Sequence, residues 1–252
     1  MKCRDPKRSA WARAELHRHL SGQQIATPIA RPLELANVRI LLDQLSGKVV
    51  TVDSQLIERL RIRELLENWV IWRDTGEWER FRTLWSEDGR MMATWKQGTF
   101  EEFIQASVEG WKKGVRILHF LGGSSIDISQ DRAIAQTKMT ITQRAEIERV
   151  PCDVVCTGRF YDFLRLIEGD WKLVLRQPIY EMDRLNLVSP GQIPNLDLEL
   201  LNRFPVGYRH LAYLQSRIGY SVKPDMPGLD GAEVQALYIQ GQRWLAHEGL
   251  NP

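Results

Sequence analysis

Apolar residues recur at intervals of three and four between residues 51 and 75, a pattern typical of an amphipathic helix. The apolar face consists of Leu56, Leu60, Leu65, Leu66, Trp69 and Val70. Asp53 or Ser54 can cap the first turn, and Gly76 follows the last one. We therefore expect a long helix that begins near residue 53 and ends at Gly76.

Shorter elements follow this helix. A second helix is predicted over Glu77–Trp85, and Arg90–Trp95 has the composition of a strand. A third helix is expected over Thr99–Lys113, because it starts with Thr-Phe-Glu-Glu and Gly114 comes directly after it.

Four long extended segments come next, with turn signals at residues 129–131, 150–151 and 168–170. The segments are Val115–Ser129, Arg132–Val150, Asp153–Ile167 and Trp171–Asp183. Long neighbouring strands with short turns predict an antiparallel meander. Residues 51–183 are therefore expected to form an α+β fold, a cone-shaped barrel in which helices pack inside a strongly curved sheet.

Two regions flank the predicted barrel. Residues 1–50 are expected to form a basic extension with one short helix near Pro32–Leu42. Residues 184–252 are expected to form a helical C-terminal extension packed on the barrel, with helices near 196–203, 208–218 and 232–247. Two roles stay open for this extension: a lid over the mouth of the barrel, or the plainer one of an oligomer contact.

The composition is that of a globular protein, with 43% hydrophobic and 26% charged residues. A net charge of +2 is too small to indicate a nucleic-acid partner. No apolar stretch is long enough for a membrane span, and three cysteines make no disulfide framework. We therefore predict a cytoplasmic protein with neither a nucleic-acid nor a membrane partner.

Two residues stand out against their apolar surroundings. Positions 62, 66 and 70 of the first helix are apolar and lie four apart, so the next member of the series, Asp74, points toward the interior or its mouth. A turn cap near Gly76 is the plainer role for this carboxylate. His119 lies among apolar residues in a predicted strand, where a lone histidine is usually a core residue. A carboxylate beside it would orient the ring for proton abstraction.

Arg176 lies in the last predicted strand, where alternation places it on the same face as Val174. A guanidinium in this position usually reaches the rim of the sheet and pairs with a surface carboxylate. It could instead hold an anionic or departing group of a ligand.

These residues carry a family resemblance. The run Arg59–Gly89, with Trp72-Arg73-Asp74-Thr75-Gly76 at its centre, resembles the opening of SnoaL-like proteins of the nuclear-transport-factor-2-like superfamily. The segment Gly169-Asp170-Trp171-Lys172-Leu173 is similar to their last hairpin. In the branch of scytalone dehydratase and hexachlorocyclohexane dehydrochlorinase, an aspartate ends the first helix and a histidine follows the third. Asp74 and His119 fall in both places, and Arg176 matches the last-strand arginine of the dehydrochlorinase.

The resemblance implies a cofactor-independent lyase of the dehydratase or dehydrohalogenase type. His119 would be the general base, Asp74 would orient it, and Arg176 would assist the leaving group. Trp69 and Met91 are expected to line a pocket for a hydrophobic, cyclic substrate. No metal-binding spacing is visible, and we predict no cofactor. The fold also implies a homo-oligomer, a dimer or trimer.

Departures from the family keep other functions open. Scytalone dehydratase polarises its substrate with tyrosines and a second histidine, whereas Met91 stands in the first strand here and residues 132–167 contain no histidine. The alternatives are a ketosteroid-isomerase-like proton-transfer isomerase, or a non-catalytic module that binds small molecules or assembles.

Overall fold

The computed structural model describes residues 53–249. The predicted basic arm, the short helix near residues 32–42 and the boundary at residue 50 lie outside this range. Cys152 and Cys156, both within it, are buried free thiols on one strand.

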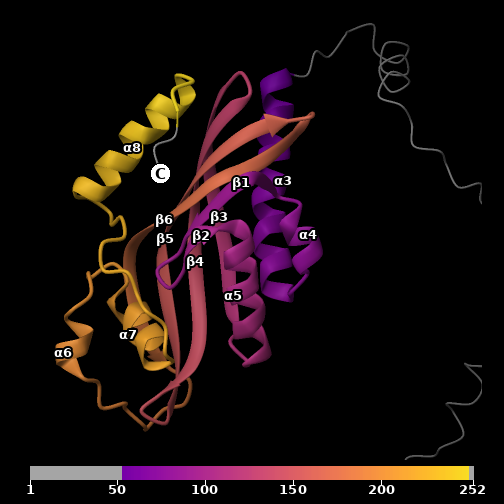
Figure 1. Ribbon diagram of the computed structural model, residues 1–252. Coiled ribbons are helices and arrows are strands. Elements are labelled where there is room, and N and C mark those ends of the chain that lie inside the picture. Colours follow the sequence, from indigo (N-terminus) through magenta and orange to yellow (C-terminus); the bar gives the residue numbers. More distant parts are fainter. Residues whose placement is uncertain (1–52, 250–252) are drawn as a thin grey trace, which may run out of the picture. The chain divides into compact units, whose positions relative to one another are not determined.

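Six strands form one curved sheet in the order β2-β1-β6-β5-β4-β3 (Figure 1). Their bounds are β1 Trp85–Met92, β2 Gln97–Thr99, β3 Ile117–Ser129, β4 Arg132–Ile147, β5 Val150–Ile167 and β6 Asp170–Leu187. The four long strands form the predicted antiparallel meander, and β1 pairs with β2 in the same sense. Only the pairing of β1 with β6 is parallel among the described strands. The predicted α+β fold with a curved sheet is confirmed.

Three helices gather on one side of the sheet (Figure 1): α3 (Ser54–Thr75), α4 (Trp78–Arg82) and α5 (Phe100–Lys112). Asp53 caps α3 by accepting a hydrogen bond from the backbone of Gln55. Gly76 ends the helix at φ 77°, a left-handed conformation that glycine adopts without strain. A capping box between Thr99 and Glu102 begins α5 as the sequence predicts.

Several predicted bounds are wrong. The first strand begins at Trp85 instead of Arg90 and ends at Met92 instead of Trp95. The turn between β4 and β5 lies at Glu148 and Arg149, both at positive φ, and not at residues 150–151. The last strand continues past Asp183 to Leu187. The division of the chain into three regions stays a prediction.

The C-terminal region adds three helices to this fold. They are α6 (Leu198–Leu201), α7 (Arg209–Arg217) and α8 (Ala232–Leu245). Leu211, Ala212 and Leu214 of α7 belong to the main hydrophobic core, together with residues of α3 and of the sheet. By contrast, α8 lies on the face of the sheet away from α3–α5 and covers a second apolar cluster that includes Phe163 (Figure 1).

None of the helices between residues 53 and 249 combines the length and the apolar character that a bilayer crossing requires.

Candidate functional site

The centre of the candidate site is a contact between Asp74 and His119. The apolar series Ile62, Leu66 and Val70 is buried, and Asp74, the next member of the series, contacts His119 near the start of β3. His119 Nδ1 lies 2.7 Å from Asp74 Oδ1, and the backbone N–H of His119 donates to Asp74 Oδ2 at 2.6 Å. Two bonds from one residue fix the ring in a single orientation. The plainer role for Asp74, a turn cap near Gly76, is not what the structure shows.

The Asp74 contact determines which nitrogen of His119 has a free lone pair and can accept a proton. Because Nδ1 faces the carboxylate, it carries the proton, and Nε2 keeps its lone pair. The His119 side chain is only 6% exposed. Burial lowers the pKa of His119, and attraction to Asp74 opposes this shift. The ring is therefore neutral near pH 7, as a general base must be.

His119 lies along an interior cavity between α3, α5 and the sheet. The part of this cavity next to it, the His119 end, is lined by Trp69 and Met91, the two residues predicted for a pocket. Trp69 meets the His119 ring edge-on at a centroid distance of 5.4 Å. A second part, the Arg73 end, shares Arg73, Trp95, Ile117 and Gln215 with the first. We call the two parts together the interior cavity.

The interior cavity is narrow. Its water-sized volume is about 30 Å³ at the His119 end and about 10 Å³ at the Arg73 end. Such a volume suits one or two water molecules rather than a ring system. Leu211 and Gln215 of α7, together with Tyr220, form part of the wall. A cyclic ligand therefore enters only when this wall moves outward.

Arg176 does not reach the rim of the sheet. It is fully buried, and its Nε and Nη2 donate to both oxygens of Asp162 at 2.7 and 2.8 Å. Its guanidinium lies 4.2 Å from the ring centroids of both Trp69 and Phe160. Nη1 has no hydrogen-bond partner within the described part of the chain. The partner of Arg176 is thus a buried carboxylate on β5 and not the expected surface carboxylate.

The predicted shared face of Val174 and Arg176 is also wrong. Val174 packs in the cluster under α8, whereas Arg176 points to the opposite face, toward Trp69. The cause is a bulge in the pairing of β5 with β6, where the register shifts between Phe163 and Leu164. One extra residue reverses the alternation of faces.

A second carboxylate–histidine pair has nearly the same local geometry. His210 Nδ1 lies 2.8 Å from Asp183 Oδ1, and the backbone N–H groups of His210 and Leu211 donate to Asp183 Oδ2. Neither His210 nor Asp183 is among the residues that line the interior cavity. Asp183 caps the start of α7, so this pair has a structural role. Sequence reasoning missed it, because the family resemblance that pairs Asp74 with His119 does not extend to His210.

Among residues 53–249, no three His, Cys, Asp or Glu side chains come together as a metal ion requires.

Comparison with known proteins places the chain in a family. A model of the SnoaL-like domain matches residues 54–177. Pea pathogenicity protein 2 of Fusarium vanettenii is 37% identical over 209 residues, covering 79% of this chain and 90% of that protein. This chain belongs to the family of Pea pathogenicity protein 2 and carries a SnoaL-like domain. An uncharacterized protein of Emericella nidulans is 34% identical, with 77% of this chain and 88% of that protein covered.

Solved structures with the same kind of fold are more distant. A putative scytalone dehydratase from Novosphingobium aromaticivorans is 21% identical, with a TM-score of 0.46, and the match covers 56% of this chain and 95% of that one. A type 2 hexachlorocyclohexane dehydrochlorinase is 11% identical with the same TM-score, covering 56% of this chain and 97% of that one.

Proposed function

We propose that this protein is a cofactor-independent lyase that acts on a hydrophobic, cyclic small molecule. The observation that carries the proposal is a neutral imidazole held by Asp74 with its free nitrogen beside a mostly apolar cavity. His119 Nε2 takes a proton from carbon, and the C–H electron pair becomes the new double bond. The leaving group departs from the neighbouring carbon with its own bonding pair. A halide leaves as the anion, whereas a hydroxyl leaves as water by taking the proton back from the His119 imidazolium.

Asp74 has an electrostatic role in this reaction. When His119 accepts the proton, the imidazolium forms 2.7 Å from a carboxylate that is itself only 12% exposed. The attraction between the two charges is stronger there than in water, because the effective dielectric constant is lower. General-base catalysis of this kind contributes roughly 10²–10⁴-fold in rate.

Arg176 belongs to the same proposal with a modified role. Two of its nitrogens are held by Asp162, and Arg176 is not among the residues that line the interior cavity, so it acts on the leaving group only indirectly. Arg176 stacks on Trp69 and Phe160, and both of these rings contact the His119 ring. These contacts support a role for Arg176 in positioning the aromatic wall beside His119.

One observation favours the alternative of a non-catalytic module, and that is the small volume of the interior cavity. A proton-transfer isomerase would use the same base and the same cavity. The predicted homo-oligomer is supported by exposed Leu118, Phe120 and Met182, which lie on the uncovered parts of strands β3 and β6.

The test compares two matched histidine variants on a panel of cyclic β-hydroxyketones and halogenated rings. His119→Gln is expected to lower the rate of elimination by about 10²–10⁴-fold, because it removes the base. His210→Gln removes the histidine of the pair outside the cavity and should leave the rate nearly unchanged. Equal rates in wild type and His119→Gln, with both folded by circular dichroism, would exclude His119 as the base. Release of an isomer instead of water or halide would favour the isomerase.

A further inference from the structure

Arg73 is a buried cation that the proposed elimination does not use. It precedes Asp74 on α3, and its side chain is 7% exposed. Its ion pair within the described residues is a long one, 3.6 Å from Nη1 to Asp74 Oδ1. That carboxylate already accepts two shorter bonds from His119. The guanidinium fork therefore keeps most of its hydrogen-bonding capacity for another group.

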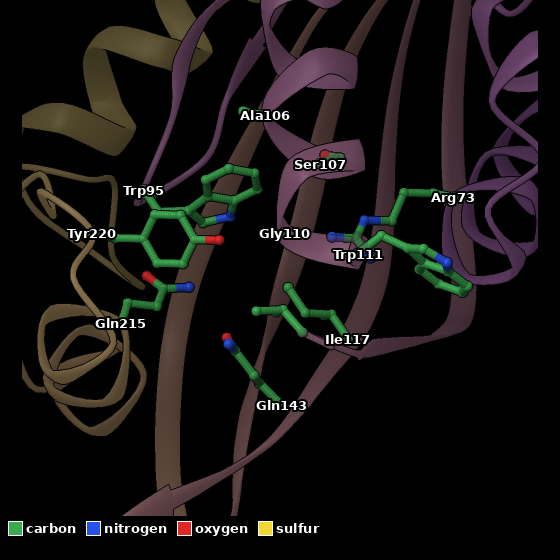
Figure 2. A pocket seen from close by; sticks show the side chains of 11 residues that line it. Arg73, Trp95, Ala106, Ser107, Gly110, Trp111, Ile117, Gln143, Gln215 and Tyr220 are labelled. Atoms are coloured by element: carbon green, nitrogen blue, oxygen red, sulfur yellow. The ribbon is translucent and has the colours of Figure 1, made fainter. Parts of the chain in front are cut away.

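Other polar side chains converge on the same space. Figure 2 shows the Arg73 guanidinium, the Tyr220 hydroxyl and the amides of Gln215 and Gln143 pointing toward one another across the Arg73 end. Gln215 Oε1 accepts a hydrogen bond from Thr94 at 2.7 Å, which turns its NH₂ group toward the cavity.

Two further atoms at this end show that the protein does not satisfy the site by itself. Ser107 Oγ and Gln143 Oε1 are buried and have no hydrogen-bond partner among residues 53–249. Buried polar atoms without partners are costly, and a cluster of them around a buried cation points to a polar ligand group.

The donors determine which ligand group fits. Arg73, Tyr220, Gln215 and Ser107 all offer N–H or O–H groups and outnumber the unpaired acceptor Gln143 Oε1, so the Arg73 end favours a ligand group with several lone pairs. A carboxylate leaves Gln143 Oε1 without a partner. A guanidinium fork matches the two oxygens of a carboxylate, and charge-assisted bonds of this type are about twice as strong as neutral ones. Burial lowers the pKa of Arg73, which indicates that a negative partner would stabilise its charged form.

We propose that the Arg73 end is a subsite for the carboxylate of a small apolar acid. This inference deepens the proposed function, because it names a substrate class: a cyclic molecule with its reacting carbon at His119 and a carboxylate at Arg73. The carboxylate orients the ring and lies apart from the reacting carbon. The binding step itself does not depend on the elimination.

The wall of the subsite also provides the route of entry. Tyr220 follows Gly219, which has a φ of 95° and lies just after the end of α7. The ring of Tyr220 packs against that of Trp95, with a centroid distance of 5.1 Å. Tyr220 is partly exposed, whereas Arg73, Gln143 and Gln215 are buried. A ligand that enters displaces its ring, and its hydroxyl can then close on the carboxylate.

The experiment measures binding of two acid–amide pairs, benzoate with benzamide and acetate with acetamide, by calorimetry on the full chain. Wild type is expected to bind the acid at least about 10-fold more tightly than the amide in one or both pairs. Arg73→Met should abolish the preference, and Tyr220→Phe should reduce it several-fold. Arg59→Met, the same substitution at an exposed position of α3, should leave it unchanged.

Three results would overturn the subsite: no preference in wild type for either pair, no detectable binding of any of the four, or a preference that survives in Arg73→Met. Tyr220→Phe deletes one hydroxyl and keeps the test informative if Arg73→Met fails to fold. His119→Gln separates this proposal from the previous one. If wild type prefers the acids but catalyses no elimination, the subsite stands and the lyase proposal fails. If His119→Gln loses elimination and keeps the acid preference, both proposals stand.

Discussion

At the scale of single residues, the protonation of His119 governs any proton abstraction in the cavity. Burial lowers its pKa, Asp74 opposes the shift, and the cations Arg73 and Arg176 add to it. We therefore expect kcat/KM for elimination to fall in acid with an apparent pKa below the ordinary histidine value of about 6.5. A profile from pH 4 to pH 9 measures it. An apparent pKa well above that value would contradict the lowered pKa.

The same shift connects pH to folding. In the unfolded chain His119 has its ordinary pKa, so as pH falls the unfolded state takes up the proton first. The contribution of His119 to stability is therefore present above about pH 6.5 and is lost as pH falls toward its folded-state pKa. Urea unfolding at several pH values checks this, since His119→Gln should flatten the slope between pH 5 and 7 relative to His210→Gln.

The four-residue helical series predicted the direction of Asp74. Its pairing with His119 was implied by the family resemblance. The same reasoning did not identify Arg73, Gln215 and Tyr220 as neighbours in one cavity. Their meeting depends on how α7 packs on the sheet, which no local pattern encodes. Arg73 carries a weak signal, as a cation next to the aspartate that ends the helix. The wrong face for Arg176 followed from a bulge that the alternation of residues does not show.

At the scale of elements, α8 packs closely against β5 because one of its residues is a glycine. Gly241 lies in the middle of this helix, and a Cβ there would come within 2.9 Å of Tyr161 Cζ. Alanine normally stabilises a helix relative to glycine by about 1 kcal/mol. We expect the reverse for Gly241→Ala, a loss of about 1–3 kcal/mol, because the tightly packed Tyr161 ring must shift.

Thermal or urea unfolding of Gly241→Ala gives the sign directly. The double variant Gly241→Ala with Tyr161→Phe removes the hydroxyl nearest to the new methyl group and should recover part of the loss. A more stable single variant would show that α8 is not held against β5 by this close approach.

Elements with strong end signals were predicted well. Asp53, Thr99 and Gly76 mark the ends of α3 and α5, because each satisfies backbone groups that the helix leaves free. The start of β1 was missed, since Glu-Asp-Gly at residues 87–89 is typical of a turn but lies in an irregular strand. The turn at Glu148 and Arg149 was missed because two charged residues adopt the positive φ usually taken by glycine. The parallel pairing of β1 with β6 depends on contacts distant in sequence.

At the scale of the molecule, the described chain has one core to which both halves of the sequence contribute. Trp69 of α3, Phe160 of β5 and Leu211 of α7 belong to the same cluster. Leu211 also lines the interior cavity. The C-terminal helices are therefore not equivalent: α7 completes the core and the cavity, whereas α8 covers a separate cluster on the far face. The division into a barrel and a C-terminal extension stays a prediction, and α7 packs as part of the main core.

A matched pair of leucines tests this difference. Leu211 and Leu237 are both buried, the first on α7 in the main core and the second on α8 in the separate cluster. Replacing either with alanine should cost about 2–5 kcal/mol of unfolding free energy. Because α7 shares its core with α3 and β3, Leu211→Ala should lower amide-exchange protection in both of those elements and weaken carboxylate binding. Leu237→Ala should leave carboxylate binding in place, since Leu237 does not line the interior cavity. If β3 keeps its full amide-exchange protection in Leu211→Ala while α7 loses its own, the C-terminal helices unfold as an independent unit. The core that holds His119 then does not depend on α7.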